Sequence, residues 1–378
     1  MKALKTVLDL GLRNVLFWVS RHIDYPLVPP DSIQVNFTFR CNLRCKMCSM
    51  HDHMVELVNK GVRIEIDTET FKKIIREAAE LGIKSIIFIG GEPLLREDLF
   101  ELIRFAKSFG MNTVMITNGV LLEGAYVDEC FRSKLDCVAV SIDAATENTL
   151  SRIRGPGVLG RIVENVERIN GIKKARNSAQ PAVTAICTIM NENVEELFDI
   201  VLLCHRIGAG NVSFQPVVRN NVDQSDSRGS GGLLLSPDKL DALDYSIDKL
   251  IAYKKRFPDM ITNSVRHLVL IKEYFRGTLS YKDVWPCYAG YNRLQITQDY
   301  VIYFCVPPES NCSTSFGDVS KDSLRKLWFS SEAHKRRKLI RKCKAPCLQC
   351  CSYRDDFPRL SETVAGWLGK TFGKDGKG

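Results

Sequence analysis

Three cysteines near the start of the chain, Cys41, Cys45 and Cys48, stand in the short run CNLRCKMC. Three thiolates can hold a [4Fe-4S] cluster and leave one iron open, where the amino and carboxylate groups of a methionine-type ligand could bind. A zinc site would usually need a fourth ligand, which His51 or His53 could supply. Because short Cys-x2-Cys spacings occur with both metals, the cysteines alone leave zinc and an iron-sulfur cluster open.

A second group of cysteines lies near the C-terminus. Cys287 and Cys305 bracket an expected hairpin made of residues 293–296 and 301–305, while Cys347 and Cys350 form a Cys-x2-Cys turn. Four thiolates arranged in this way could close a tetrahedral zinc site or fully ligate a cluster. Three more thiols lie in the same region and are left unassigned: Cys312, Cys343 and Cys351.

The 14 cysteines among 378 residues would indicate disulfides in a secreted protein. We expect a cytoplasmic protein instead, because no secretory signal precedes them. Charged residues also interrupt the apolar stretch 1–23 before it could span a bilayer, so this stretch is expected to be an amphipathic helix. Four cysteines fall in helix or strand patterns and are expected in the core: Cys130, Cys137, Cys187 and Cys204.

Short β-branched runs alternate with helical patterns between about residues 32 and 215, which indicates βα units around a parallel sheet. The expected strands are residues 33–37, 85–89, 113–117, 138–142, 182–189 and 212–214. Gly82, Gly110 and Gly208 stand where three of the intervening helices should end. The pattern predicts an α/β fold, a partial (β/α)6 TIM-like barrel.

The mass of 42.7 kDa suits a barrel with a smaller domain beside it. We expect an N-terminal helix or extension over 1–30, the barrel over 31–218 and a helical linker region over 219–284, which opens with a Gly- and Ser-rich stretch. A small cysteine-rich α+β domain is expected over 285–355, followed by a C-terminal helix and disordered tail over 356–378.

Three motifs follow the second, third and fourth expected strands. They are Gly90-Gly91-Glu92-Pro93, Thr117-Asn118-Gly119 and Ser141-Ile142-Asp143-Ala144. Each alone could be a turn or an ordinary strand end. All three stand at carboxyl ends of strands, where βα barrels build their sites, and they follow the cysteine loop. Together they indicate one common site.

This combination resembles the radical S-adenosylmethionine (SAM) superfamily over about residues 33–216. The resemblance implies that Cys41, Cys45 and Cys48 bind a catalytic [4Fe-4S] cluster, and that the cluster binds SAM. It also implies a set of SAM-contacting residues: Met47, Gly90, Gly91, Glu92, Thr117, Asn118, Ser141, Asp143 and Arg154.

Within that set, the 90–93 segment would contact the SAM amino group, with glycines that let backbone carbonyls approach and Glu92 adding charge. Ser141 and Asp143 match positions that meet the ribose hydroxyls. Arg154 resembles the carboxylate-binding arginine, with Arg152 as its competitor. Met47 departs from the family, in which this position is often aromatic.

Residues 285–353 resemble the twitch domain, the shorter relative of the SPASM domain. The resemblance implies an auxiliary [4Fe-4S] cluster on Cys287, Cys305, Cys347 and Cys350, although any unassigned neighbouring cysteine could replace one of these ligands. The further cysteines that a full SPASM pattern places after the Cys-x2-Cys pair are missing, so a second auxiliary cluster is not expected.

The resemblance implies an enzyme that reductively cleaves SAM to a 5′-deoxyadenosyl radical and abstracts a substrate hydrogen. We expect oxidation of a small molecule, because about 30 residues before the barrel are too few for a fused peptide-recognition domain. The alternative is a radical SAM/SPASM peptide maturase that cross-links a ribosomal peptide. An alternative of another class is a zinc-stabilised nucleic-acid-binding protein, which would bind nucleic acid in a salt-sensitive way.

The net charge of +9 and the basic stretch 335–344 suit an acidic flavodoxin- or ferredoxin-like electron donor, and no nucleic acid is expected. Apolar stripes near both termini either pack on the barrel ends or contact a membrane peripherally. Their members are Leu4, Val7, Leu8, Val15 and Leu16, then Leu360, Val364, Trp367 and Leu368. The substrate is not specified, although His51, Asp52, His53 and Gln215 could line its site.

Overall fold

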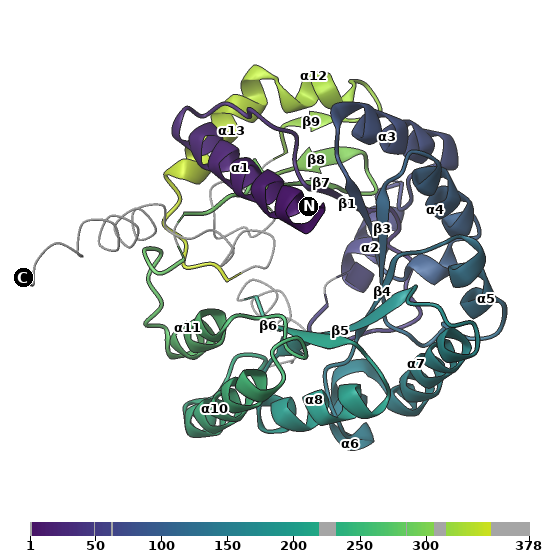
Figure 1. Ribbon diagram of the computed structural model, residues 1–378, viewed down its shortest axis with the longest axis vertical. Coiled ribbons are helices and arrows are strands. Elements are labelled where there is room, and N and C mark those ends of the chain that lie inside the picture. The colour runs from purple at the N-terminus through teal and green to yellow at the C-terminus, as the bar shows by residue number, and fades with distance from the viewer. Residues whose placement is uncertain are drawn as a thin grey trace, which may run out of the picture.

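The computed structural model describes residues 2–48, 50–61, 63–218, 232–284, 286–305 and 315–348, with side chains left out for 2–11 and 51–53. In these ranges nine strands form one sheet in the order β6-β5-β4-β3-β2-β1-β7-β8-β9 (Figure 1). The six parallel strands are β1 Ser32–Asn36, β2 Ser85–Ile89, β3 Asn112–Thr117, β4 Cys137–Ser141, β5 Ala182–Ile189 and β6 Asn211–Pro216. They lie within two residues of the six expected strands, so the predicted fold is confirmed.

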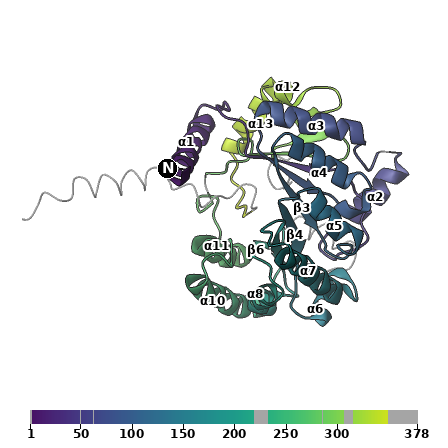
Figure 2. The same ribbon diagram turned by 45° about the vertical axis from the view of Figure 1, so that its right-hand side comes forward.

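Helices surround the parallel strands on one face of the sheet (Figures 1 and 2). They include α3 Thr68–Leu81, α4 Leu99–Ser108, α5 Ala125–Arg132, α7 Val158–Ala175 and α8 Leu197–Arg206. The expected terminating glycines Gly82, Gly110 and Gly208 have φ angles of 92°, 72° and 80°. This left-handed backbone suits glycine and ends each helix before the next strand.

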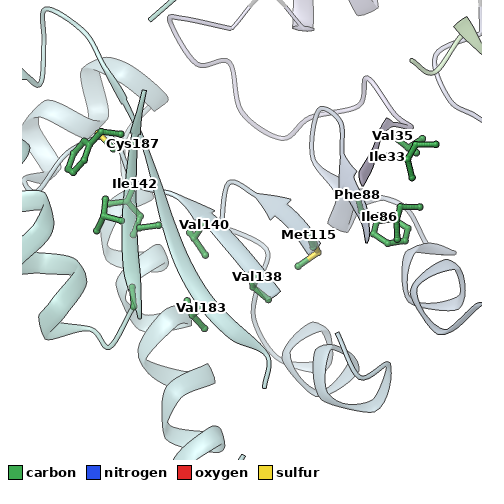
Figure 3. Packing of buried hydrophobic residues seen from close by; sticks show 14 of the residues in the cluster. Ile33, Val35, Ile86, Phe88, Met115, Val138, Val140, Ile142, Val183 and Cys187 are labelled. Atoms are coloured by element: carbon green, nitrogen blue, oxygen red, sulfur yellow. The ribbon is translucent and has the colours of Figure 1, made fainter. Parts of the chain in front are cut away.

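The strand register separates an apolar face from a polar one. Alternate residues such as Val35, Phe88 and Val140 are fully buried against the helices (Figure 3). Their neighbours face away from the helices, and one register row pairs Gln34 with Ile87 on one side and with Gln295 on the other. The inner face of the barrel is therefore the more polar of the two, and it leads to the carboxyl ends of the strands.

The C-terminal segment extends the same sheet. β7 Arg293–Ile296 pairs in parallel with β1, and β8 Val301–Tyr303 and β9 Gly317–Asp318 follow in antiparallel order. The expected hairpin between Cys287 and Cys305 is thus present, and it is continuous with the barrel. The proposed domain boundaries stay a prediction.

The remaining described helices comprise three in stretches expected to be helical, at the N-terminus and in the region 219–284, and four that the sequence patterns did not indicate. They are α1 Lys2–His22, α2 Met50–Asn59, α6 Glu147–Arg154, α10 Leu240–Arg256, α11 Val265–Arg276, α12 Leu324–Trp328 and α13 Ser331–Arg341, with short 3-10 turns at Pro93–Leu95, Val194–Glu196 and Pro237–Lys239. Within the described ranges, none of these helices combines the length and apolar character that crossing a bilayer requires.

Helix α13 contains much of the basic stretch 335–344, which is only partly a surface. Arg337 is 1% exposed, and its guanidinium lies 4.3 Å from the Trp328 ring centroid and 4.8 Å from that of Phe304. It donates hydrogen bonds to the carbonyls of Gly290 and Trp328. Arg337 is therefore not available to an electron donor, and aromatic rings and carbonyls compensate its burial. The predicted docking of a donor on this stretch stays a prediction.

Candidate active site

The cysteine loop follows β1 and is fixed by backbone hydrogen bonds. The Cys48 N–H donates to the Cys45 carbonyl at 3.0 Å, and the Lys46 N–H donates to the Ile153 carbonyl of α6 at 2.8 Å. The Leu43 N–H donates to the Cys41 Sγ at 3.4 Å. All three thiols therefore stand on one short loop at the carboxyl end of the sheet, as expected.

Burial affects the protonation of Cys45 and Cys41. It raises the pKa of the Cys45 thiol to about 11, although nearby Arg154 acts in the opposite direction. Burial also raises the pKa of Cys41. Since a thiol must lose its proton to ligate a metal, iron binding at this loop would release protons.

An apolar cluster surrounds the loop. Cys45 and Met47, each 9% exposed, pack with Ile153 of α6 and with Met190 and Val217, which follow β5 and β6. Met47 therefore lies beside the cysteines, as expected, and forms part of an apolar wall. This wall would limit the access of water to a bound cluster.

Arg154 lies against the cysteine loop. Its Nη1 is 3.8 Å from the Cys45 Sγ, and its Nε and Nη2 lie 2.7 and 2.5 Å from the Asp143 Oδ2. Burial lowers the pKa of Arg154, but the Asp143 carboxylate raises it above its ordinary value. Arg152 is exposed and donates to Thr149 instead. Of the two arginines, Arg154 is the one that contacts the cysteine loop; its role in binding the SAM carboxylate stays a prediction.

Asp143 has protein partners on both oxygens. Besides Arg154, it accepts a hydrogen bond from the Thr188 N–H at 2.7 Å. Asn193 donates to the Asp143 carbonyl at 2.7 Å and to the Thr188 carbonyl at 2.8 Å. The carboxylate thus joins the ends of β4 and β5, and its expected contact with the SAM ribose stays a prediction, as does that of Ser141.

Glu92 is fully buried and binds other loops. Its carboxylate accepts hydrogen bonds from the Thr117 hydroxyl and the Asn118 N–H, both at 2.8 Å, and from the Leu94 N–H at 3.1 Å. Asn118 also donates to Asn42 of the cysteine loop at 2.8 Å. Burial raises the pKa of Glu92, although these hydrogen bonds act to lower it. The residues expected to contact SAM here therefore form a network that joins three strand ends.

The paired glycines are required by the protein backbone itself. A Cβ on Gly91 would lie 2.2 Å from the Arg40 carbonyl oxygen, and one on Gly90 would lie 2.5 Å from that of Thr38. The Gly91 and Glu92 N–H groups donate to these same two carbonyls. The glycines thus let the 90–93 segment pack against the start of the cysteine loop; an approach of SAM to this segment stays a prediction.

Sequence reasoning missed the residues that join these loops, namely Asn42, Asn193 and the ion pair of Lys46 with Glu192. The only available signal was their position at the carboxyl ends of β1 and β5. The side chains of His51, Asp52 and His53, proposed as wall residues, lie outside the described residues. Gln215 lies on β6, opposite Thr188.

The second cysteine group surrounds the β7–β8 hairpin. Cys305 is buried and Cys287, Cys343 and Cys347 are partly buried. The Cys287 carbonyl accepts a hydrogen bond at 2.9 Å from Arg21 of α1. The unassigned Cys312 and Cys351, and the predicted ligand Cys350, lie outside the described residues.

The expected core cysteines differ among themselves. Cys130, Cys187 and Cys204 are fully buried, whereas Cys137 is partly buried and faces Thr184. Across the part of the chain that the structure describes, no three Cys, His, Asp or Glu side chains are grouped as a metal site. The cluster ligands therefore stay predictions. The loop that contains Cys41, Cys45 and Cys48 provides three thiols that could ligate iron.

Comparison with known families gives two matches. The profile of the radical SAM superfamily matches residues 35–204, and the profile of SPASM, an iron-sulfur cluster-binding domain, matches residues 287–351. Together they cover more than half of the chain. The second match begins at Cys287 and ends at Cys351, which is the region predicted to hold the auxiliary cluster.

Curated relatives include the PqqA peptide cyclase of Gluconobacter oxydans, 34% identical over 185 residues, which cover 49% of this chain and only 48% of that protein. The PqqA peptide cyclase of Granulibacter bethesdensis is 26% identical over 85% of this chain and 80% of its own length. The probable GTP 3′,8-cyclase of Saccharolobus solfataricus is 25% identical over 75% of this chain and 85% of its own length.

Among solved structures, Streptococcus suis SuiB bound to the precursor peptide SuiA superimposes with a TM-score of 0.62 at 16% identity, covering 88% of this chain and 71% of that chain. At this identity the likeness concerns the fold. It agrees with the partial barrel seen here.

These matches give no support to a zinc-stabilised nucleic-acid-binding protein, since one profile belongs to a SAM-dependent enzyme family and the other to an iron-sulfur domain. The cofactors are those expected from the motifs: SAM, the iron-sulfur cluster that binds it, and an auxiliary cluster. This chain belongs to the radical SAM superfamily and is a radical SAM enzyme with a C-terminal SPASM domain.

Proposed function

We propose that this enzyme modifies a peptide, most simply by forming a cross-link within it. The observation that carries the proposal is the match to PqqA peptide cyclases, which extends over 80% of the relative from Granulibacter bethesdensis. The expected oxidation of a small molecule is supported less well. The curated relatives favour what the sequence offered as the alternative, a peptide maturase.

The inner face of the barrel suits a neutral, amide-rich substrate. Strands β1 to β6 contain no charged residue, whereas on β7, which is parallel to β1, Arg293 donates hydrogen bonds to Ser32 and Gln34. Gln34, Asn36 and Gln215 project polar amides from the inner register rows, and amides both donate and accept hydrogen bonds as peptide groups do. The Asn36 Oδ1 is buried without a hydrogen-bond partner among the described residues.

A nucleotide substrate is the second candidate, because of the relative named as a probable GTP 3′,8-cyclase. A triphosphate needs several cations close together. Of the basic side chains in and beside the cysteine loop, Lys46 is paired with Glu192, Arg154 with Asp143 and Arg40 with Glu65. Among the described residues of this loop, Arg44 is left as a single exposed cation, where a triphosphate needs several. The described barrel therefore fits a peptide better than a triphosphate.

For the first cofactor site, we propose that Cys41, Cys45 and Cys48 ligate the cluster. When bound, the cluster and SAM supply the 5′-deoxyadenosyl radical that removes a hydrogen atom from a substrate carbon. Arg154 would orient the SAM carboxylate while Asp143 holds the guanidinium in place. The network around Glu92 would hold the loops after β1, β2 and β3 in fixed positions relative to one another.

For the auxiliary cluster, we propose Cys287, Cys305, Cys347 and Cys350 as ligands, within the matched SPASM domain. A protein with both clusters holds about eight iron atoms. Replacing Cys287 by alanine should reduce this to about four while 5′-deoxyadenosine formation persists. Unchanged iron in this variant would exclude Cys287 as a required ligand.

The reaction also needs an electron donor. We propose a flavodoxin- or ferredoxin-like protein of the cytoplasm, in keeping with the net charge of +9.

The test is anaerobic incubation of the reconstituted enzyme with SAM, a chemical reductant and synthetic peptides encoded beside its gene. A cross-link removes two hydrogen atoms, so mass spectrometry should find a product lighter by that amount, located by fragmentation. The control is the enzyme with Cys41, Cys45 and Cys48 replaced by alanine. Consumption of GTP with no change in any peptide would support the nucleotide candidate and refute ours.

A further inference from the structure

Helix α1 is amphipathic, but its apolar face points outward and its more polar face packs on the protein. The residues that pack on the protein are largely polar: Ser20 and Arg21 are 0% and 1% exposed, beside Phe17 at 1%. The residues that face outward are apolar, with Leu12 61%, Val15 40% and Ile23 52% exposed. The sequence patterns leave two alternatives for this terminus, packing on the barrel or contact with a membrane. In the structure one face of the helix packs on the protein, and the apolar stripe lies on the opposite, outward face.

The outward stripe is regular. Leu12, Val15, Leu16, Val19 and Ile23 recur at the three- and four-residue spacing of one helix face, and Leu16 and Val19 are only half-buried. In the sequence, Leu4 and Leu8 continue the same spacing. An apolar helix face turned toward solvent is unfavourable in a monomer and indicates that something covers it.

The apolar surface continues beyond the end of α1. Tyr25 and Leu27 are 50% and 45% exposed in the segment that follows the helix. The Tyr25 ring lies 5.9 Å from that of Phe329, which is itself 39% exposed. Exposed aromatic rings beside an aliphatic stripe are typical of surfaces that sit at the lipid-water boundary.

Positive charge lies beside this surface on α13. The two helices lie side by side in Figures 1 and 2, and Arg341 of α13 donates to the His22 carbonyl at 3.0 Å and pairs with Asp24 at 3.0 Å. On the same helix the lysines Lys338 and Lys342 are exposed, and so is Lys335, which pairs with Glu332 at 3.3 Å. The apolar stripe therefore ends next to a cationic group.

We propose that this surface binds the face of an anionic lipid bilayer, with the α1 stripe inserted among the acyl chains and the α13 lysines on the headgroups. An aliphatic stripe together with lysines matches both components of an anionic membrane. A second copy of the chain would cover the aliphatic stripe but would supply no negative charge to the lysines. An acidic protein would satisfy the lysines but would not account for the aliphatic stripe.

The experiment is flotation of the full-length, cluster-loaded enzyme with vesicles of phosphatidylcholine alone or mixed with an equal amount of phosphatidylglycerol. Wild type should float with the mixed vesicles and, at moderate salt, not with phosphatidylcholine alone. The variant Leu12→Ser/Val15→Ser/Ile23→Ser should bind at least roughly tenfold more weakly, because each side chain loses apolar burial. Lys335→Glu/Lys338→Glu/Lys342→Glu should abolish the preference for anionic lipid.

A matched control is Leu202→Ser/Tyr245→Ser, which changes exposed apolar side chains, 43% and 63% exposed, on α8 and α10. It should bind vesicles as wild type does. The proposal is overturned if wild type floats with neither vesicle, or if the α1 variant binds as tightly as wild type. It is also overturned if the stripe substitutions convert a dimer to a monomer with no effect on flotation, or if the lysine reversals slow reduction by flavodoxin while vesicle binding is unchanged.

Discussion

Asp143→Asn tests whether the buried pair with Arg154 organises the site. The two side chains are 1% and 8% exposed and their charged atoms lie 2.5–2.7 Å apart. Asparagine can still accept the Thr188 N–H, but it leaves the guanidinium buried without a counter-charge. Breaking one partner of a buried ion pair costs about 3–5 kcal/mol, a large part of the roughly 5–15 kcal/mol by which proteins are stable.

The assay is urea unfolding of the metal-free, reduced protein, followed by circular dichroism. The matched control is Asp128→Asn, whose pair with Arg176 spans 3.4 Å between side chains that are 47% and 50% exposed. This surface pair should contribute less than about 1 kcal/mol. Adding Arg154→Met to Asp143→Asn should recover much of the loss, because the unpaired cation is gone. If Asp143→Asn costs no more than Asp128→Asn, the pair does not have the role assigned to it.

Two further predictions concern the glycine segment and a buried histidine. Gly91→Ala should displace the cysteine loop and lower bound iron after reconstitution, whereas Gly160→Ala, with open space around its Cβ, should not; equal iron in both would contradict the packing argument. Burial lowers the pKa of His267 to about 4 from 6.5, so the unfolded chain binds a proton first on acidification. Stability should therefore fall by about 1.4 kcal/mol per pH unit between those values. The free energy of unfolding in urea should depend less steeply on pH in His267→Gln than in wild type, whereas the exposed His205→Gln should match wild type. Identical slopes for wild type and both variants would refute this prediction.

The barrel could be predicted because its strands are short, uncharged and β-branched, and because glycines mark the helix ends. Gly82, for example, has to adopt φ 92° where α3 stops. The extension of the sheet by β7 could not be predicted in this way, because its pairing with β1 joins residues more than 250 positions apart. Local patterns carry no information on such a contact.

The site could be predicted in its parts but not in its connections. The motifs locate Glu92 and Asp143 at strand ends, yet the sequence does not show that Glu92 accepts hydrogen bonds from Thr117 and Asn118. These hydrogen bonds depend on how neighbouring loops meet. The burial of Arg337 among Phe304 and Trp328 was hidden for the same reason, since a basic run in a sequence resembles a surface.

The substrate class was the weakest sequence inference. Cofactor motifs report what binds the cluster and SAM, whereas the substrate meets the inner face and the loops, which have no shared motif. The length before the barrel led to the expectation of a small molecule, and relatives aligned along most of their length favour a peptide.

The most direct test of the account is iron and 5′-deoxyadenosine measured on the same anaerobic preparation, after addition of SAM and a reductant. Wild type should contain about eight iron atoms per chain and form 5′-deoxyadenosine. The Cys41→Ala/Cys45→Ala/Cys48→Ala variant should retain about four and form none. Wild type without iron, or a variant that forms 5′-deoxyadenosine as fast as wild type, would contradict the assignment of this loop.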